Sequence, residues 1–155
     1  MRRSKLMAAV VAATVFLAGC GGSNPGPSGS DSGVASAADH LREGRSVYAD
    51  TCSVCHGNRG QGGIGPSLAS VVETWPACRD HIEWISLGSE GWRAAHGDAY
   101  GAPGRPLAGG MPGQTDLTPE EMRLVAAFER VEYGGQDPDD ALADCGVVEP
   151  DAATG

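Results

Sequence analysis

The stretch YADTCSVCHGNRG spans residues 48–60 and contains two cysteines followed directly by a histidine: Cys52, Cys55 and His56. The spacing C-x-x-C-H is typical of covalent haem attachment. Two thiols a short turn apart can add to the two vinyl groups on one edge of a porphyrin. The adjacent histidine then lies under the iron as an axial ligand. This stretch therefore predicts one covalently bound haem c.

Other chemistries use a C-x-x-C pair, and each requires a different context. A zinc site needs two more ligands at paired spacing, whereas Cys78 and Cys145 are single and distant. A redox-cycling thiol pair is expected between a strand and a helix, whereas Cys52 follows a predicted helix. A structural disulfide between Cys52 and Cys55 is a third alternative. Haem attachment is favoured over all three.

The N-terminus has the pattern of an export signal. Residues 1–19 begin with Arg2, Arg3 and Lys5 and continue with the apolar run LMAAVVAATVFLAG. That run is short for a membrane-spanning helix, which needs roughly 20 apolar residues. It ends in LAGC, which resembles the lipobox of bacterial lipoproteins, where the signal is removed and lipid is attached to the cysteine, here Cys20. An uncleaved anchor, or secretion with a free Cys20, are the alternatives.

The chain is predicted to have four parts. After the signal (1–19), residues 20–38 comprise the lipidated cysteine and a tether rich in Gly, Ser and Pro. Such a tether has a typical end-to-end distance of about 25 Å, and it serves either as a swinging arm or as a simple spacer. Residues 39–146 form the folded domain, and 147–155 are a disordered tail. The protein is therefore expected to be exported and lipid-anchored, facing the periplasm or the cell exterior.

The charge balance limits the partners. Three of the 11 basic residues lie in the predicted signal, so the remaining chain has 8 basic and 20 acidic residues and a formal charge of −12. Nucleic acid is excluded as an expected partner because its binding requires a basic patch. Redox partner proteins with a basic docking patch fit this charge. Solubility alone is the alternative explanation.

Helical periodicity is the main secondary-structure signal. Thr118, Pro119 and Glu121 form the start of the clearest helix, with a capping box and a proline at the first helical position. No alternating run reaches the length of a strand. The predicted helices cover residues 39–51, 76–87 with Gly88 as a stop signal, 118–133, and a short segment around 138–143.

Long loops and a thin core accompany these helices. The Gly- and Pro-rich segments 57–67 and 97–114 are loops, and the chain has only two phenylalanines. Long structureless loops in a compact domain indicate function or a wrong assignment. A large apolar cofactor wrapped by the loops accounts for both features. The predicted fold class is therefore all-α, with about three to five helices and long loops around one haem.

The second axial ligand of the iron is sought among five side chains. Met111 lies in the loop LAGGMPG, which can bring a side chain over a haem face without a helix in the way. Met122 lies in the last helix and is predicted to be a core residue, and His81 is predicted to be a surface or structural residue. His40 and His96 have no supporting pattern. Met111 is therefore the predicted ligand.

Residues 44–133 resemble a class I cytochrome c, the small monohaem kind. The matching residues are Gly44, Tyr48, Cys52, Cys55, His56, Pro66 and Leu68 in GIGPSL, Met111-Pro112, Leu124 and Phe128. The resemblance implies that Gly44 permits a close crossing of the first and last helices. It also implies that the Pro66 carbonyl accepts a hydrogen bond from His56, and that Leu68 packs on the haem.

The chain departs from the simplest members of that family in the long segment 88–110 and in its tail, 134–155. In the long segment, Trp92 and Tyr100 either contact the haem or are ordinary core residues. Two further cysteines are left. Cys78 and Cys145 have no role in lipid or haem attachment. Two remaining cysteines in an exported protein indicate a disulfide between them. Two separate thiols are the alternative.

The predicted function follows from the ligands. With His56 and Met111 both on the iron, no position is open for substrate, so the iron only changes valence. The chain is expected to carry single electrons between membrane respiratory complexes and not to be an enzyme. The alternatives are a haem enzyme or gas sensor with an open axial site, assisted by His96 or Arg105, and a fixed cytochrome subunit of an oxidase or dehydrogenase complex.

Overall fold

A computed structural model describes residues 35–149 of the 155-residue chain. The predicted signal at 1–19, the predicted lipidation site Cys20 and most of the predicted tether lie outside the described residues. Within residues 35–149, none of the helices combines the length and the apolar character that crossing a bilayer requires.

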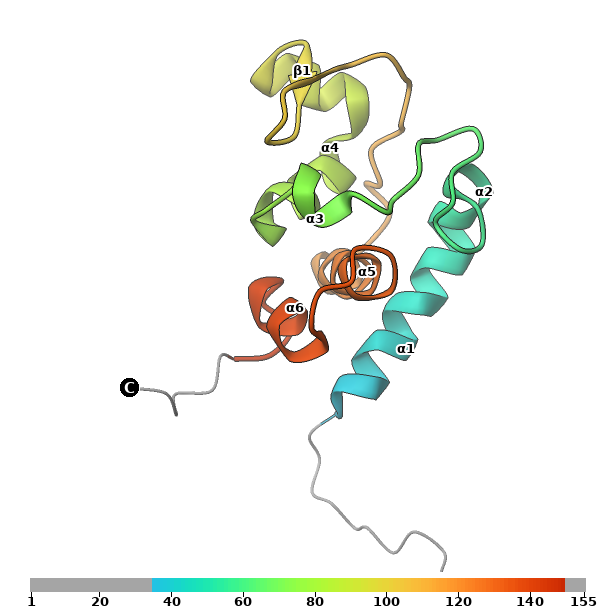
Figure 1. Cartoon of the computed structure of the whole chain (residues 1–155), viewed down its shortest axis with the longest axis vertical. Coiled ribbons are helices and arrows are strands. Elements are labelled where there is room, and N and C mark those ends of the chain that lie inside the picture. Colours follow the sequence, from blue (N-terminus) through green and yellow to red (C-terminus); the bar gives the residue numbers. More distant parts are fainter. Residues whose placement is uncertain (1–34, 150–155) are drawn as a thin grey trace, which may run out of the picture. The chain divides into compact units, whose positions relative to one another are not determined.

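The described domain is helical apart from one short hairpin (Figure 1). The two strands of the hairpin are antiparallel, and Tyr100 is paired with Arg105. In chain order the elements are α1 (Ala37–Val47), the π-helical turn η1 (Tyr48–Cys52), α2 (Ser53–His56), α3 (Val71–Thr74), α4 (Cys78–His96), β1 (Ala99–Tyr100), β2 (Arg105–Pro106), α5 (Pro119–Glu132) and α6 (Pro138–Asp144).

The folded domain is slightly longer at both ends than 39–146. Helix α1 begins at Ala37, inside the segment assigned to the tether. At the other end, Val147 and Val148 pack partly against the core.

Helices α1 and α5 cross at Gly44. Figure 1 shows α5 along its axis while α1 runs across the view. A Cβ atom at Gly44 would lie 2.8 Å from the Cβ of Phe128 and would overlap the carbonyl oxygen of Leu124. The ring of Tyr48 packs against Phe128 with its centroid 5.6 Å away. The crossing therefore requires a residue without a side chain, and the predicted role of Gly44 is confirmed.

Two capping boxes begin the crossing helices. At α5, Thr118 accepts a hydrogen bond from the Glu121 amide and Glu121 accepts one from the Thr118 amide, as predicted. The bonds that the Glu121 carboxylate accepts from the Thr118 amide and, second, from the Thr118 hydroxyl lower the pKa of Glu121. Ser36 and Asp39 form the same motif at α1, where no capping box had been predicted. The hydrogen bonds to Asp39, first that from the Ser36 hydroxyl, lower its pKa to about 2.

The helix predicted for 76–87 was expected to end at Gly88. In the structure, α4 is only kinked at Gly88 and continues beyond it. Gly88 has φ 61° and ψ −171°, and helical turns resume after it up to His96. A Cβ atom at Gly88 would lie 2.5 Å from the carbonyl oxygen of Met111. The kink therefore makes room for the loop that carries Met111.

The core consists of two clusters. The first joins η1, α4, α5 and α6, with partly buried residues of α1 packed against it. Its buried members are Tyr48, Cys78, Ile85, Met122, Val125, Ala126, Ala127, Phe128, Leu142 and Cys145. The second is an aromatic cluster that the sequence analysis did not identify, in which Trp75 and Trp92 are buried and Trp84 and Tyr100 are partly buried. The Trp92 indole donates a hydrogen bond to the Ala99 carbonyl at 2.9 Å.

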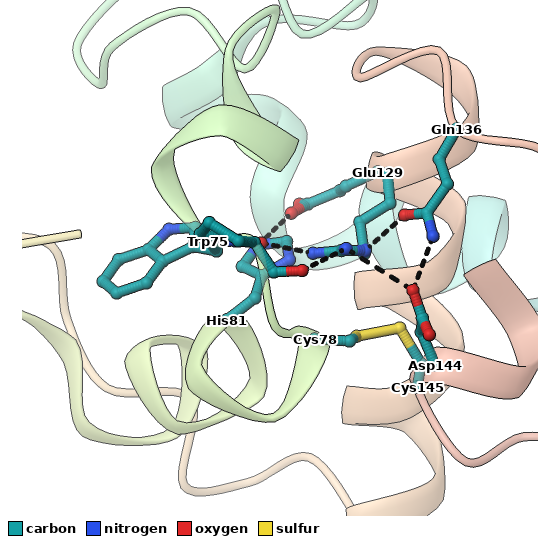
Figure 2. Close-up of a disulfide and its surroundings, with 9 residues drawn as sticks. Trp75, Cys78, His81, Glu129, Gln136, Asp144 and Cys145 are labelled. Carbon is teal, nitrogen blue, oxygen red and sulfur yellow. Dashed lines mark hydrogen bonds and ion pairs between the residues drawn. A yellow bond between two sulfur atoms is a disulfide. The ribbon is translucent and has the colours of Figure 1, made fainter. Parts of the chain in front are cut away.

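The C-terminal segment is fastened to the start of α4. A disulfide joins Cys78 to Cys145 (Figure 2). Beside it, the Arg130 side chain is 1% exposed. Its guanidinium donates to the carbonyl oxygens of Trp75 at 2.6 Å and of the following residue at 3.1 Å, and to Gln136 at 2.7 Å. Because buried charge is costly without partners, this network locks α5 and the C-terminal segment onto the loop before α4.

Candidate functional site

One cavity brings the predicted cofactor residues together. Its volume is about 470 Å³, within the range of roughly 300–1,000 Å³ that is usual for ligand and cofactor pockets. The cavity is bounded by the C-x-x-C-H stretch, the loop after it, α3, α4, the hairpin and the methionine loop, and its lining is mostly apolar. The lining includes Cys52, Cys55, His56, Pro66, Leu68 and Met111.

The His56 ring is held from two sides. It is 8% exposed at the end of α2. Its Nδ1 atom lies 2.8 Å from the carbonyl oxygen of Pro66, which accepts the Nδ1 hydrogen. A Cβ atom at Gly65 would lie 2.8 Å from the Cε1 atom of the ring, so the backbone there touches the imidazole edge. With Nδ1 as donor, Nε2 keeps its lone pair, which is the arrangement of a metal-ligating histidine.

The two cysteines of the motif line the cavity and are not bonded to each other. In residues 35–149, Cys52 and Cys55 are the cysteines outside a disulfide. Burial, assisted by the Glu129 carboxylate, raises the pKa of the Cys52 thiol. A thiol with a raised pKa is a poor redox-cycling nucleophile. Cys78 and Cys145 are bonded to each other and so do not supply the further ligands of a zinc site.

Met111 is positioned by its own backbone. Its amide donates to the Ser89 hydroxyl at 2.9 Å, and its carbonyl oxygen accepts from the Ser89 amide at 2.8 Å. Further along the loop, the Gln114 amide donates to the Ile85 carbonyl at 2.9 Å. The loop is therefore attached to both sides of the α4 kink. Met122, in contrast, is 9% exposed in the core cluster and is not part of the cavity lining.

The histidines divide into those inside and those outside the site. His40 and His96 do not line the cavity, and the His96 ring lies 2.9 Å from Glu83. His81 does line it and is 2% exposed, so of its two predicted positions, surface or structural, the surface one was wrong. The signal that could have found it is a spacing of four along α4, since Ile85 and Ser89 also line the cavity.

The rim of the cavity is exposed and apolar beside the cysteines. Val54 and Ile64 are 76% and 86% exposed, and both line the cavity. On another part of the lining, Trp84, Tyr100 and Arg105 contribute side chains. No sequence pattern indicated the place of Trp84, whereas contact of Tyr100 with the haem was one of its two predicted roles.

A family model for cytochrome c matches residues 41–128. The chain belongs to the cytochrome c family. Cytochrome c-L of Methylorubrum extorquens is 31% identical over 99 residues, which are 64% of this chain and 43% of that protein. The chain therefore matches less than half the length of this relative.

The domain is thus a class I cytochrome c fold that carries a covalently bound c-type haem. The haem supplies an iron that changes between Fe(III) and Fe(II). The residues of the cavity fit this group, since two thiols, an oriented imidazole and a thioether line one apolar space. Cys52 and Cys55 would form the thioether links, and His56 would bind the iron through Nε2.

Proposed function

We propose that this cytochrome is a lipid-anchored carrier that exchanges single electrons with membrane respiratory complexes, with His56 and Met111 as the two iron ligands. The observation that carries the proposal is the position of both residues on one cavity, with His56 Nδ1 bonded to the Pro66 carbonyl and the Met111 backbone bonded to Ser89. Two protein ligands leave no coordination site for substrate. The protein is therefore a carrier and not an enzyme.

Met111 is a better candidate for the second ligand than His81, the histidine that lines the cavity besides His56. The His81 Nε2 atom is engaged by Glu129 at 3.0 Å, whereas the Met111 side chain carries no such bond. A methionine ligand raises the reduction potential. The apolar lining acts in the same direction because it disfavours the extra charge of the oxidised iron.

The partner surface is proposed to lie at the exposed apolar rim. Val54 lies between the two cysteines of the motif and Ile64 in the following loop, and both side chains are exposed. A haem edge near the cysteines would come close to a partner that covers this rim. The formal charge of −12 outside the predicted signal favours a partner with basic groups, because opposite charges steer encounter.

Optical spectra of the oxidised protein test the ligation. The marker is the weak far-red charge-transfer band of methionine sulfur on Fe(III). We expect the band in wild type and in the control Met122→Leu, and its loss in Met111→Ala. A high-spin wild type would show an open axial site and support a haem enzyme or gas sensor. A low-spin wild type without the band would indicate a histidine ligand.

The anchor is tested on Cys20, which lies outside the described residues. We expect wild type in the membrane fraction, with the mature chain beginning at a Cys20 that carries lipid by mass spectrometry. Cys20→Ser is expected to remain uncleaved or to leave the membrane. An unmodified Cys20 in mature protein would contradict the anchor.

Purification in mild detergent distinguishes a mobile carrier from a fixed subunit of a larger complex. We expect the cytochrome to elute as a small species by size exclusion. Stable elution with an oxidase or dehydrogenase complex would instead support the fixed-subunit alternative.

A further inference from the structure

A buried ionisable pair lies on the cavity and has no part in haem attachment or in the proposed ligation. His81 on α4 and Glu129 on α5 approach to 3.0 Å between Nε2 and Oε2, with side chains 3% and 5% exposed. Figure 2 shows the two side chains directed toward each other across the helix interface. Both residues line the cavity. Any charge on this pair is therefore placed next to the cofactor and away from water.

The His81 ring has one nitrogen in use and one free. Nε2 faces the Glu129 carboxylate, while Nδ1 is buried and has no hydrogen-bond partner among the described residues. In a neutral imidazole one nitrogen donates and the other accepts. The arrangement fits an Nε2–H bonded to Glu129 and a free lone pair on Nδ1. Nδ1 is therefore the atom that can take up a further proton.

The other ionisable groups near the pair do not take up or release a proton near neutral pH. Arginine keeps its charge, and the cysteine is a thioether once haem is attached. Burial raises the pKa of both tyrosines, so they stay protonated. The aspartates are exposed and paired with arginines. Tyr48 and Cys52 on η1 and Tyr133 after α5 interact with Glu129. Arg130 follows Glu129 on α5, Asp80 precedes His81 on α4, and Asp144 on α6 lies 3.9 Å from Arg130.

We propose that the His81–Glu129 pair binds one proton when the haem is reduced and releases it when the haem is oxidised. On reduction, an electron-donor protein gives one electron to the iron, and one proton from solvent binds His81 Nδ1. On oxidation, an acceptor protein takes the electron, and the proton returns to solvent. The proposal rests on the electron transfer of the proposed function and adds a proton to it.

The direction of the coupling follows from charge. The oxidised iron carries one more positive charge than the reduced iron, and it repels an imidazolium on the same cavity. Glu129 stabilises that imidazolium and so keeps the protonated form accessible. At an effective protein dielectric constant of about 20, such a coupling changes proton affinity on the order of tenfold.

The test is the reduction potential of the haem-loaded protein as a function of pH, measured by spectroelectrochemistry from pH 5 to pH 9. In wild type, the ratio of reduced to oxidised protein at a fixed electrode potential is expected to fall with rising pH. The limit is tenfold per pH unit, or about 59 mV. His81→Gln keeps an N–H donor for Glu129 but cannot bind the proton, and it is expected to remove most of this slope. A wild type without a slope, or a His81→Gln variant that keeps more than half of it, would overturn the proposal.

The chain provides a matched control. His96 and Glu83 form a pair at 2.9 Å with side chains 39% and 45% exposed, and His96 is not in the cavity lining. Because solvent screens this pair, His96→Gln is expected to keep the wild-type slope. Loss of the slope in His96→Gln would show that the proton binds His96 and not His81, and it would overturn the proposal.

A second measurement needs no variant to fold. In wild type with ¹⁵N-labelled histidine, the pH midpoint of the His81 ring is expected to be about one unit higher in reduced than in oxidised protein, the tenfold change in affinity. Equal midpoints would overturn the coupling. The outcome is separable from the ligation by Met111, which the far-red band reports. If His81 were itself the iron ligand, the His81→Gln variant would become high-spin. That spectrum would overturn both the ligation by Met111 and the proton binding by the His81–Glu129 pair.

Discussion

Ser89 and Met111 are joined by two hydrogen bonds that run in opposite directions. The Met111 amide donates to the Ser89 hydroxyl at 2.9 Å, and the Ser89 amide donates to the Met111 carbonyl at 2.8 Å. The Ser89 amide is free for this purpose because the helical dihedrals are interrupted at Gly88. A break in α4 thus becomes the attachment point of the proposed ligand loop.

Ser89→Ala removes the side-chain half of this arrangement. The loss of one hydrogen bond costs about 1 kcal/mol, and here it acts on the loop more than on the whole domain. We expect the far-red methionine band to disappear at a lower temperature than in wild type, while far-UV circular dichroism unfolds close to its wild-type temperature. Coincident and unchanged transitions would show that the hydroxyl does not hold the loop.

Gly88→Ala tests whether the kink depends on close approach. The new Cβ would meet the Met111 carbonyl oxygen at 2.5 Å, and overpacking of this kind costs roughly 1–3 kcal/mol. Gly104→Ala is the matched control, since Gly104 has φ 63° but no atom within 4 Å of the new Cβ. Guanidinium unfolding is expected to show a clearly larger loss for Gly88→Ala. Equal losses of stability in the two variants would show that backbone strain, and not close approach to Met111, causes the destabilisation.

The disulfide is predicted to stabilise the domain without taking part in electron transfer. Cys78 and Cys145 are 67 residues apart in the chain, and closing a long loop stabilises by about 2–4 kcal/mol. The double variant Cys78→Ala, Cys145→Ala is expected to lose about that much in denaturant unfolding while keeping the far-red band. Wild-type stability in the double variant would contradict this role.

The capping box of α1 predicts that the domain loses stability at low pH as Asp39 is protonated. Hydrogen bonds lower the pKa of Asp39 from 3.8 to about 2. The folded-state pKa is below the unfolded one, so the stabilisation is complete above about pH 4 and is lost as pH falls toward 2. Titration of the Asp39 carboxyl carbon by NMR should give a midpoint near 2. Ser36→Ala should move that midpoint back toward 3.8, and an unmoved midpoint would contradict the capping box.

Local chemistry made part of this protein predictable from its sequence. The C-x-x-C-H motif acts through residues that are neighbours in the chain, so its meaning does not depend on the tertiary fold. The same holds for the capping box of Thr118 and Glu121. The exchange of bonds between Ser89 and Met111, in contrast, joins positions 22 residues apart, and no local pattern indicates it.

The misses have tertiary causes. Gly88 has the pattern of a helix stop, and only contact with the Met111 loop makes it a kink inside a longer helix. His81 has the sequence context of a surface residue on α4, yet its partner Glu129 comes from another helix. The burial of Trp75, Trp84 and Trp92 depends on how α3, α4 and the hairpin meet, which periodicity along one segment cannot reveal.

The central claim is that Met111 lies over the haem iron, and the most direct measurement is the NMR spectrum of the reduced protein with ¹³C-methyl methionine. The porphyrin ring current shifts a methyl group bound over its face far upfield. Residues 35–149 contain two methionines, Met111 and Met122. We predict that the Met111 methyl is strongly shifted and that the Met122 methyl is near its ordinary position. A shifted Met122, or no shifted methionine at all, would contradict the account.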